Sequence, residues 1–276
     1  MIDKYQIKEM LGTGGFAVVY RAVHQLLDRE VALKLLRPDV ASEHPGLGAM
    51  LVDEARLAAR IQHPNVVRIY DVTHSPKLTY IVMELIDGVS LARRLLLHGA
   101  LEPRTALDVG IDIARGLAAG LERGLVHRDI KPANLLIGRD GGVRIVDFGM
   151  AYVRGQNDWL SSSGTVGTRG YMPPEQVKGS VVDFRADIYA LGITLQESCL
   201  GRESRTDSPT RSLQRLVMPQ LREVFDWMCN PDASKRPQSY DELLSVFNEL
   251  KQQLDLDRAR PSQRPRARES TRAGIG

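Results

Sequence analysis

The chain has 276 residues, enough for one large domain or for two lobes that share one site and bury a sizeable core. Hydrophobic residues make up 43% of it and charged residues 26%, with a net charge of +3, which excludes fibrous, disordered and membrane-embedded classes. There is no run of 18 apolar residues and no apolar stretch at the start, so we expect a cytoplasmic protein. Two cysteines are too few for a disulfide framework or a four-ligand zinc site, and we expect buried thiols.

The first third of the sequence favours a small sheet with one helix. Stretches rich in Val, Ile, Tyr and Leu predict strands over 5–11, 16–24, 30–36, 66–73 and 78–85. A loop with Pro38 and Pro45 precedes a helix predicted over 49–62, where apolar residues recur at helical spacing. Asp87-Gly88 then breaks the pattern, so we expect a front lobe over residues 1–87.

The rest of the folded chain favours helices, which indicates a second lobe over residues 88–254. Apolar stripes predict helices over 103–123, 186–200 and 240–254. Two short strands are expected at 135–137 and 143–146, around a turn at Asp140-Gly141-Gly142. We expect loops over 155–170 and between the last two helices.

The last residues, 255–276, have the composition of a flexible tail. Residues 258–276 hold six Arg against one Glu, which leaves a net charge of about −2 for residues 1–257. So few apolar residues cannot offset the entropy of ordering. The tail has no aromatic residues for base stacking and no amphipathic helix beside it, so we do not expect nucleic-acid or membrane binding.

Four motifs carry the functional prediction. The glycine-rich turn Gly12-Thr-Gly-Gly-Phe-Ala17 lies between two predicted strands, where backbone N–H groups can approach phosphate oxygens. Alone it is more often a tight turn. It is followed in order by Val31-Ala-Leu-Lys34, His127-Arg-Asp-Ile-Lys-Pro-Ala-Asn134 and Asp147-Phe-Gly149. With these motifs, residues 5–254 resemble the eukaryotic-type protein kinase family, most closely its bacterial Ser/Thr members.

The resemblance implies a bilobal α+β fold with ATP held between the lobes together with Mg²⁺, or Mn²⁺ as an alternative. Backbone of the turn, at Gly12, Gly14 and Gly15, would cover the phosphates. The adenine would be sandwiched between apolar side chains and bonded by the segment joining the lobes. The resemblance assigns the sandwich to Val19 and Ala32 above the adenine and Leu136 below it, with Met83 at the back of the pocket. It assigns the hydrogen bonds to backbone of Glu84 and Ile86.

Lys34 is a cation on an interior strand and needs anionic partners there. The resemblance implies that it contacts the α- and β-phosphates and pairs with a carboxylate on the predicted helix. Glu54 can face the sheet, whereas the Cβ of Asp53 points about 100° away around the helix. We therefore expect Glu54 to pair with Lys34.

The same resemblance assigns the phosphate-transfer groups. Asp129 would accept the proton of the incoming hydroxyl, and Lys131 would balance charge on the transferring group, as is typical of Ser/Thr kinases. Asn134 and Asp147 would bind the metal through oxygen atoms. Thr168 resembles the threonine that positions the catalytic Asp and Lys.

Arg128 stands directly beside Asp129 and would be poorly neutralised without an anion. We therefore hypothesise that phosphate on the following loop orders it through charge-assisted bonds. The candidate sites are Thr165 first, then Ser161, Ser162 and Ser163.

Two departures from the family pattern stand out. Ala17 replaces the usual third glycine, which is harmless if its φ is negative. The stretch from Gly192 to Arg236 is about twenty residues shorter than usual, so we expect a reduced docking helix. Glu175 is still expected to pair with Arg236, and Asp187 to hold the backbone of the catalytic loop.

Three alternatives remain open from the sequence. The first is a nucleotide-binding scaffold without activity, although Lys34, Asp129 and Asp147 are all present. The second is a small-molecule phosphotransferase, against which Lys131 and Thr168 favour protein hydroxyl groups. The third is a nucleic-acid binder acting through the basic tail. Bacterial relatives also suggest a homodimer through the front lobe, and a membrane link only if a further segment follows the tail.

Overall fold

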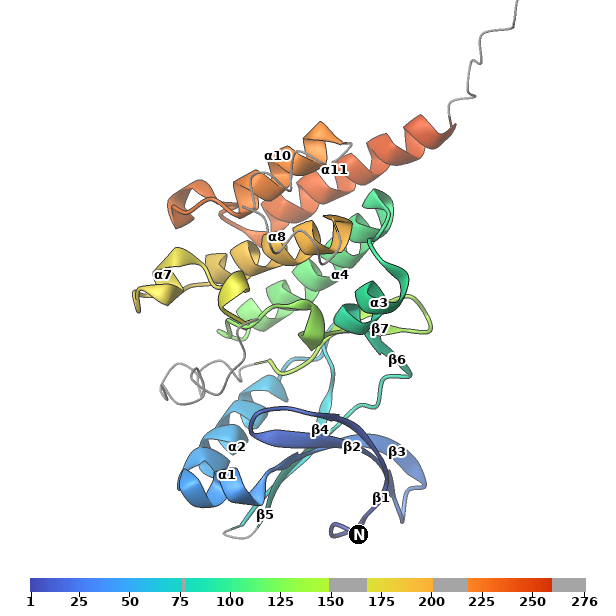
Figure 1. The fold of residues 1–276 in the computed structure, drawn as a ribbon, viewed down its shortest axis with the longest axis vertical. Coiled ribbons are helices and arrows are strands. Elements are labelled where there is room, and N and C mark those ends of the chain that lie inside the picture. Colours follow the sequence, from blue (N-terminus) through green and yellow to red (C-terminus); the bar gives the residue numbers. More distant parts are fainter. Residues whose placement is uncertain (76–77, 149–167, 201–217, 260–276) are drawn as a thin grey trace, which may run out of the picture.

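The first lobe is built on an antiparallel sheet (Figure 1). The computed structural model describes residues 1–75, 78–148, 168–200 and 218–259. Five strands lie in the order β1-β2-β3-β5-β4, with β1 at Tyr5–Thr13, β2 at Ala17–His24, β3 at Arg29–Leu36, β4 at Ile69–Ser75 and β5 at Leu78–Met83. The strand pairing places the turn between β1 and β2 at one end of the sheet, beside the strand that carries Lys34.

Two helices cover one end of this sheet. Helix α2 (Leu47–Ala58) packs on β4 and β5 and buries one apolar face, as its spacing predicts. Helix α1 (Pro38–Glu43) was expected as a loop, because Pro38 was interpreted as a breaker. Proline is tolerated in the first turn of a helix, where its missing N–H would have no intrahelical partner.

The second lobe is mainly helical (Figure 1). Its sheet has the order β6-β7-β8, with β6 at Gly88–Ser90, β7 at Leu135–Gly138 and β8 at Val143–Ile145. Its helices include α3 at Leu91–His98, α4 at Pro103–Leu121, α7 at Pro174–Val177, α8 at Arg185–Leu200, α10 at Pro219–Met228 and α11 at Tyr240–Ala259. Short 3₁₀ turns lie at Pro132–Asn134, Thr168–Tyr171 and Ala233–Lys235. The α+β bilobal fold is confirmed.

Two expectations for this lobe were wrong. Helix α10 lies in the interval predicted as loop; its buried residues Leu221, Val224, Phe225 and Met228 recur at helical spacing. Helix α11 continues to Ala259, beyond the predicted end at residue 254. Because their apolar content is low, one helix was not predicted and the predicted range of the other was too short.

The segment after α2 joins the two lobes. The predicted strand at 66–73 begins only at Ile69, because its first residues pair with the other lobe instead. The N–H of Val67 donates to the carbonyl of Ile145 (3.0 Å), and the N–H of Ile145 donates to the carbonyl of Asn65 (2.8 Å). The side-chain amide of Asn65 also donates to the carbonyl of Val143 (2.8 Å).

The largest hydrophobic cluster lies in the helical lobe around α4 and α8. Both cysteines are free thiols of intermediate exposure; Cys199 packs against this cluster, and burial raises its pKa to about 12. In the part of the chain that the structure describes, no helix has the length and apolar character to cross a membrane.

Candidate active site

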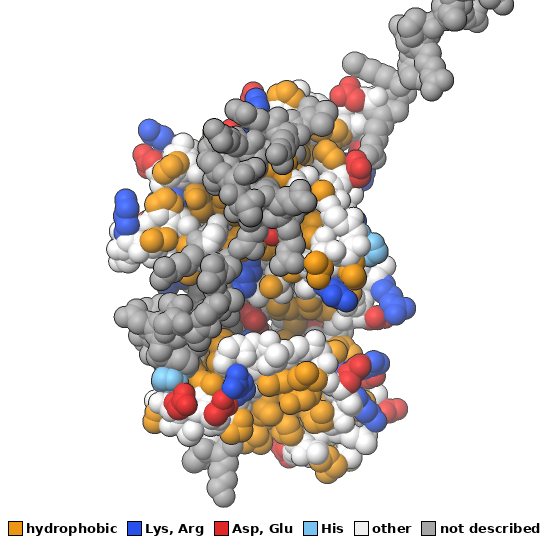
Figure 2. Space-filling model, in the orientation of Figure 1, with side chains coloured by type: hydrophobic (Ala, Val, Ile, Leu, Met, Phe, Trp, Pro, Cys, Tyr) orange, Lys and Arg blue, Asp and Glu red, His pale blue; other side chains and the backbone are white. Residues whose placement is uncertain are grey.

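Lys34 and Asp147 meet between the lobes. Lys34 lies on β3 and its Nζ atom is 2.5 Å from Oδ1 of Asp147, which follows β8. The side chains are 9% and 23% exposed. They line one cavity with apolar residues of both lobes, among them Ala55, Val67, Met83 and Phe148. Figure 2 shows the hollow between the lobes, with hydrophobic side chains on its floor.

Asp147 is held as a carboxylate. Burial raises its pKa, but the ammonium of Lys34 outweighs this, so the pKa lies below its usual value. Its backbone φ is +61°, in the left-handed region that a residue with a side chain seldom adopts. The strained backbone and the ion pair together fix where this carboxylate points.

In the loop that carries Asp129, neighbouring side chains bond to the Asp129 carboxylate. Nζ of Lys131 lies 3.0 Å from Oδ2 of Asp129, and the side-chain amide of Asn134 donates to the same oxygen at 2.8 Å. Asp129 is 6% exposed. Burial lowers the pKa of Lys131, although Asp147 acts in the opposite direction, which indicates that these charges lie near one another.

His127 and Asp187 position this loop. Asp187 accepts hydrogen bonds from the N–H groups of His127 (2.7 Å) and Arg128 (2.6 Å), which confirms its expected role. Nδ1 of His127 faces the N–H of Asp129 at 3.2 Å, and Nε2 faces the carbonyl of Val146 at 3.0 Å. One buried imidazole thus links the backbone of Asp129 with that of Val146, the residue before Asp147. This role of His127 was not predicted from the sequence, because a buried histidine gives no distinct pattern.

The predicted ion pair between Lys34 and Glu54 is not formed; within the described ranges, the salt bridge of Lys34 is to Asp147. Glu54 is buried and Asp53 exposed, as the helical spacing predicted. The error concerns the position of α2 relative to β3, which residue spacing along a helix cannot determine.

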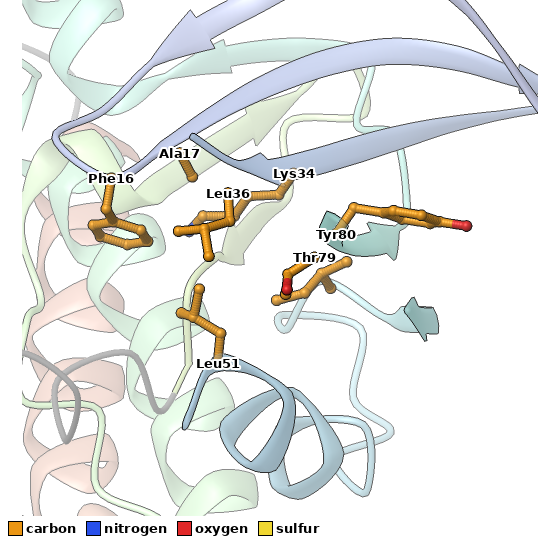
Figure 3. Close-up of a pocket in the computed structure, with 8 residues that line it drawn as sticks. Phe16, Ala17, Lys34, Leu36, Leu51, Thr79 and Tyr80 are labelled. Carbon is orange, nitrogen blue, oxygen red and sulfur yellow. The ribbon is translucent and has the colours of Figure 1, made fainter. Parts of the chain in front are cut away.

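Phe16 occupies the space between β3 and α2. It is 5% exposed and clusters with Leu36 and Leu51, and its ring centroid lies 5.2 Å from Nζ of Lys34. Figure 3 shows these side chains converging around a cavity. The glycine motif predicts only a phosphate cover here, although an aromatic residue at the tip of the turn is a signal for packing.

The glycine-rich turn itself is tight. The N–H of Gly14 donates to the carbonyl of Ala17 (2.8 Å), and Gly12 and Gly15 lie on either side. Ala17 is not among the residues with positive φ and lies in β2, opposite Leu36. The replacement of the usual glycine is therefore harmless to the backbone.

Most of the predicted adenine contacts lie together. Ala32 and Met83 are buried in one cluster, with Val19 and Ile86 packed against it. The N–H of Glu84 donates to the carbonyl of Arg68 (2.8 Å), so an adenine would meet the carbonyl of Glu84. Leu136 is half-buried on β7, apart from this cluster.

Asn134 and Asp147 suit a hard cation. The N–H of Val146 donates to the carbonyl of Asn134 (3.0 Å). Because Val146 precedes Asp147, this bond brings Asn134 and Asp147 together. The amide nitrogen of Asn134 is used by Asp129, which leaves its oxygen as the donor for a metal. Within the described ranges no cluster of three or more His, Cys, Asp or Glu residues could hold a metal. Asn134 and Asp147 would thus supply only part of the oxygen ligands that Mg²⁺ requires.

Several predicted residues cannot be placed. Gly149, Ser161, Ser162, Ser163 and Thr165 lie outside the described residues. Thr168 begins a 3₁₀ turn, but its side chain lies outside the description.

Glu175 and Arg236 form the predicted pair beneath the site. The guanidinium donates to both carboxylate oxygens, at 2.6 and 2.9 Å, and Arg236 is 1% exposed. Burial raises the pKa of Glu175, but Arg236 outweighs it and the pKa is lowered.

The carboxylates of Asp147 and Glu175 are expected to make the fold sensitive to acid. A carboxylate with a lowered pKa stabilises the folded state above its unfolded pKa, and this contribution is lost as pH falls through its folded pKa. Asp187, whose pKa is raised by burial, has the opposite sign and offsets part of it. We expect the free energy of unfolding to fall below about pH 4.

Urea unfolding between pH 7 and pH 3 measures this. Glu175→Gln cannot titrate, so its stability should decline less steeply with acid than that of the wild type. Parallel declines would contradict the assignment.

Comparisons with known proteins agree with this geometry. The protein kinase domain family matches residues 5–271. Serine/threonine-protein kinase PrkC of Bacillus subtilis (strain 168) is 39% identical over 199 residues, covering 72% of this chain and 31% of the relative. Serine/threonine-protein kinase PknB of Mycobacterium tuberculosis (strain H37Rv) is 38% identical over 214 residues, covering 75% and 34%. The chain thus spans about a third of the length of these curated relatives.

A solved structure agrees as well. The kinase domain of Mycobacterium tuberculosis PknI superposes with a TM-score of 0.74 at 26% identity, over 90% of this chain and 97% of that chain. The predicted resemblance to bacterial Ser/Thr kinases is confirmed, and the chain belongs to the protein kinase family.

Proposed function

We propose that this chain is a Ser/Thr protein kinase that transfers the γ-phosphate of ATP to protein hydroxyl groups. The observation that carries the proposal is the pair of Lys34 and Asp147 in a cavity between the lobes, next to the loop in which Lys131 pairs with Asp129. Phosphate transfer needs mainly positioning and charge neutralisation, and this set provides both.

Each residue has a distinct part in the proposed reaction. Asp129 holds a substrate hydroxyl in line and takes its proton, and Lys131 beside it neutralises charge on the transferring group. Lys34 binds phosphate oxygens. Asp147 and Asn134 would hold Mg²⁺, which when bound would neutralise charge on the phosphate group.

The contacts of Lys34 have to change before its ammonium can bind phosphate oxygens. Its ammonium is bonded to Asp147 and covered by the Phe16 ring. We infer that lifting of the turn withdraws Phe16 and lets α2 approach β3, so that Glu54 takes over as partner of Lys34. The same movement would free Asp147 for the metal.

Regulation by phosphate is the second part of the proposal. Arg128 has a φ of +61°, and its Nε atom is buried with no hydrogen-bond partner among the described residues. A phosphate group would supply that partner through charge-assisted bonds. Autophosphorylation at Thr165, or at Ser161, Ser162 or Ser163, is therefore proposed to activate the chain.

One incubation tests both parts. The chain is mixed with Mg²⁺, γ-labelled ATP and a generic basic protein, with Lys34→Met as the inactive control. We expect acid-stable phosphoserine or phosphothreonine from the wild type alone, and mass spectrometry should place phosphate within residues 161–165.

The outcomes separate the alternatives. Nucleotide binding without any transfer would favour an inactive scaffold. Full activity with no phosphate in residues 161–165 would remove autophosphorylation and leave the kinase activity standing.

A further inference from the structure

Gly120 lies buried in the last turn of α4, next to the catalytic loop. Its carbonyl accepts the N–H groups of Arg123 and Leu125, each at 3.0 Å. Glycine within a helix costs about 1 kcal/mol relative to alanine. Gly120 is not among the glycines with positive φ, so its backbone does not require glycine. The requirement must come from space.

The space is taken by Phe148. A Cβ atom built on Gly120 would overlap Cζ and Cε1 of Phe148 and lie 3.3 Å from Cε2. The phenyl ring therefore rests directly on the backbone of α4. On another side it meets His127 edge-on, with ring centroids 5.0 Å apart. Phe148 is 5% exposed and enclosed by these contacts.

The packing position of Phe148 also restricts the position of the neighbouring residue, Asp147. The two residues are adjacent in the chain, and the left-handed φ of +61° at Asp147 is a conformation that the surrounding packing has to hold. Displacing the ring from α4 would thus move the Asp147 carboxylate, which lies 2.5 Å from the ammonium of Lys34. Buried side chains pack too densely for the ring to shift without such a response.

We propose that Gly120 is a positioning residue for phosphate transfer: its missing side chain seats Phe148 against α4 and thereby fixes the position of the Asp147 carboxylate, on which both its pair with Lys34 and the proposed metal site depend. The effect on transfer rests on the proposed function, whereas the effect on the Lys34 pair does not. A displacement of about 1 Å at reacting groups can lower a rate on the order of 100-fold.

Another glycine of the same helix supplies a matched control. A Cβ on Gly110 would meet Leu195 at 3.0 Å and Phe247 at 3.1 Å, both in the core of the helical lobe. Gly110→Ala therefore introduces the same methyl group into the same helix and strains packing, but it does not touch Phe148.

The first test needs no nucleotide. Amines of the free chain are labelled with acetic anhydride, and the labelling rate of Lys34 is followed by mass spectrometry. Lys34 is 8% exposed and bonded to Asp147, so it should react slowly in the wild type and in Gly110→Ala. In Gly120→Ala the rate should rise about tenfold, equivalent to losing about 1.4 kcal/mol of protection.

The second test is a double-substitution cycle with Phe148→Leu, whose shorter side chain makes room for the added methyl group. Gly120→Ala should lower transfer and raise the Mg²⁺ concentration for half-maximal rate. In the Phe148→Leu background the same change should have little effect on Lys34 labelling or on the Mg²⁺ midpoint.

The results decide between a positioning role and a purely structural one. Wild-type labelling of Lys34 in Gly120→Ala, or equal effects of Gly120→Ala in both backgrounds, would overturn the proposal. Should Gly120→Ala not fold, folding of the double variant would support the contact, and failure of both would overturn it. A chain without kinase activity would still report through Lys34 labelling.

Discussion

Asp129→Asn is expected to lower the rate of phosphate transfer on the order of 10²–10⁴-fold, the range typical of removing a general base. Asparagine cannot accept the proton of the substrate hydroxyl. Its amide would also present N–H groups to Lys131 and Asn134, which donate to the carboxylate in the folded chain. Single-turnover transfer of labelled phosphate measures the loss.

Nucleotide affinity separates this effect from unfolding. Lys34 and the cluster around Ala32 and Met83, where adenine is predicted to bind, do not lie on the loop that carries Asp129. Nucleotide titration of Asp129→Asn should therefore match that of the wild type. Asp53→Asn is the matched control, because this carboxylate is 73% exposed on α2 and should be dispensable. A rate for Asp129→Asn within a few-fold of wild type would exclude Asp129 as the base.

Arg236→Met should have the largest effect on stability, a loss of about 3–5 kcal/mol in the free energy of unfolding. The guanidinium is bidentate to Glu175 and also donates to the carbonyls of Asn230 (2.7 Å) and Arg185 (3.0 Å). Removing it leaves a poorly solvated carboxylate, and the carbonyls of Asn230, Arg185 and Pro231 lose this donor. Urea denaturation at pH 7 measures the difference.

Arg56→Met provides the comparison. Its pair with Asp53 at 3.1 Å has side chains 67% and 73% exposed, so removing it should change stability by less than about 1 kcal/mol. Equal losses in the two variants would mean that burial does not set the value of the Arg236 pair.

The sequence predicted which residues carry the candidate site better than it predicted how they pair. Lys34, Asp129 and Asp147 could be placed because each lies in a local motif whose order along the chain is visible. The partner of Lys34 could not, because it depends on how α2 sits against β3, and that contact involves Phe16, Leu36 and Leu51 from three separate segments.

Helix boundaries followed the same division. Helix α4 was predicted from a long apolar stripe, and the structure has it at Pro103–Leu121. Helices α1 and α10 were missed, because one begins with a proline and the other has a short buried face between polar residues. Gly120 gave no signal either: the need for glycine appears only once Phe148 is placed beside it.

The bonds between residues 65–67 and β8 restrict how the cleft can open. The chain crosses from one lobe to the other near Asp87-Gly88, and the bonded segment supplies a second fastening. These two connections define a line, so the lobes can rotate about that line but cannot slide apart. Opening of the cavity between the lobes is therefore a rotation, and the groups farthest from this line travel most.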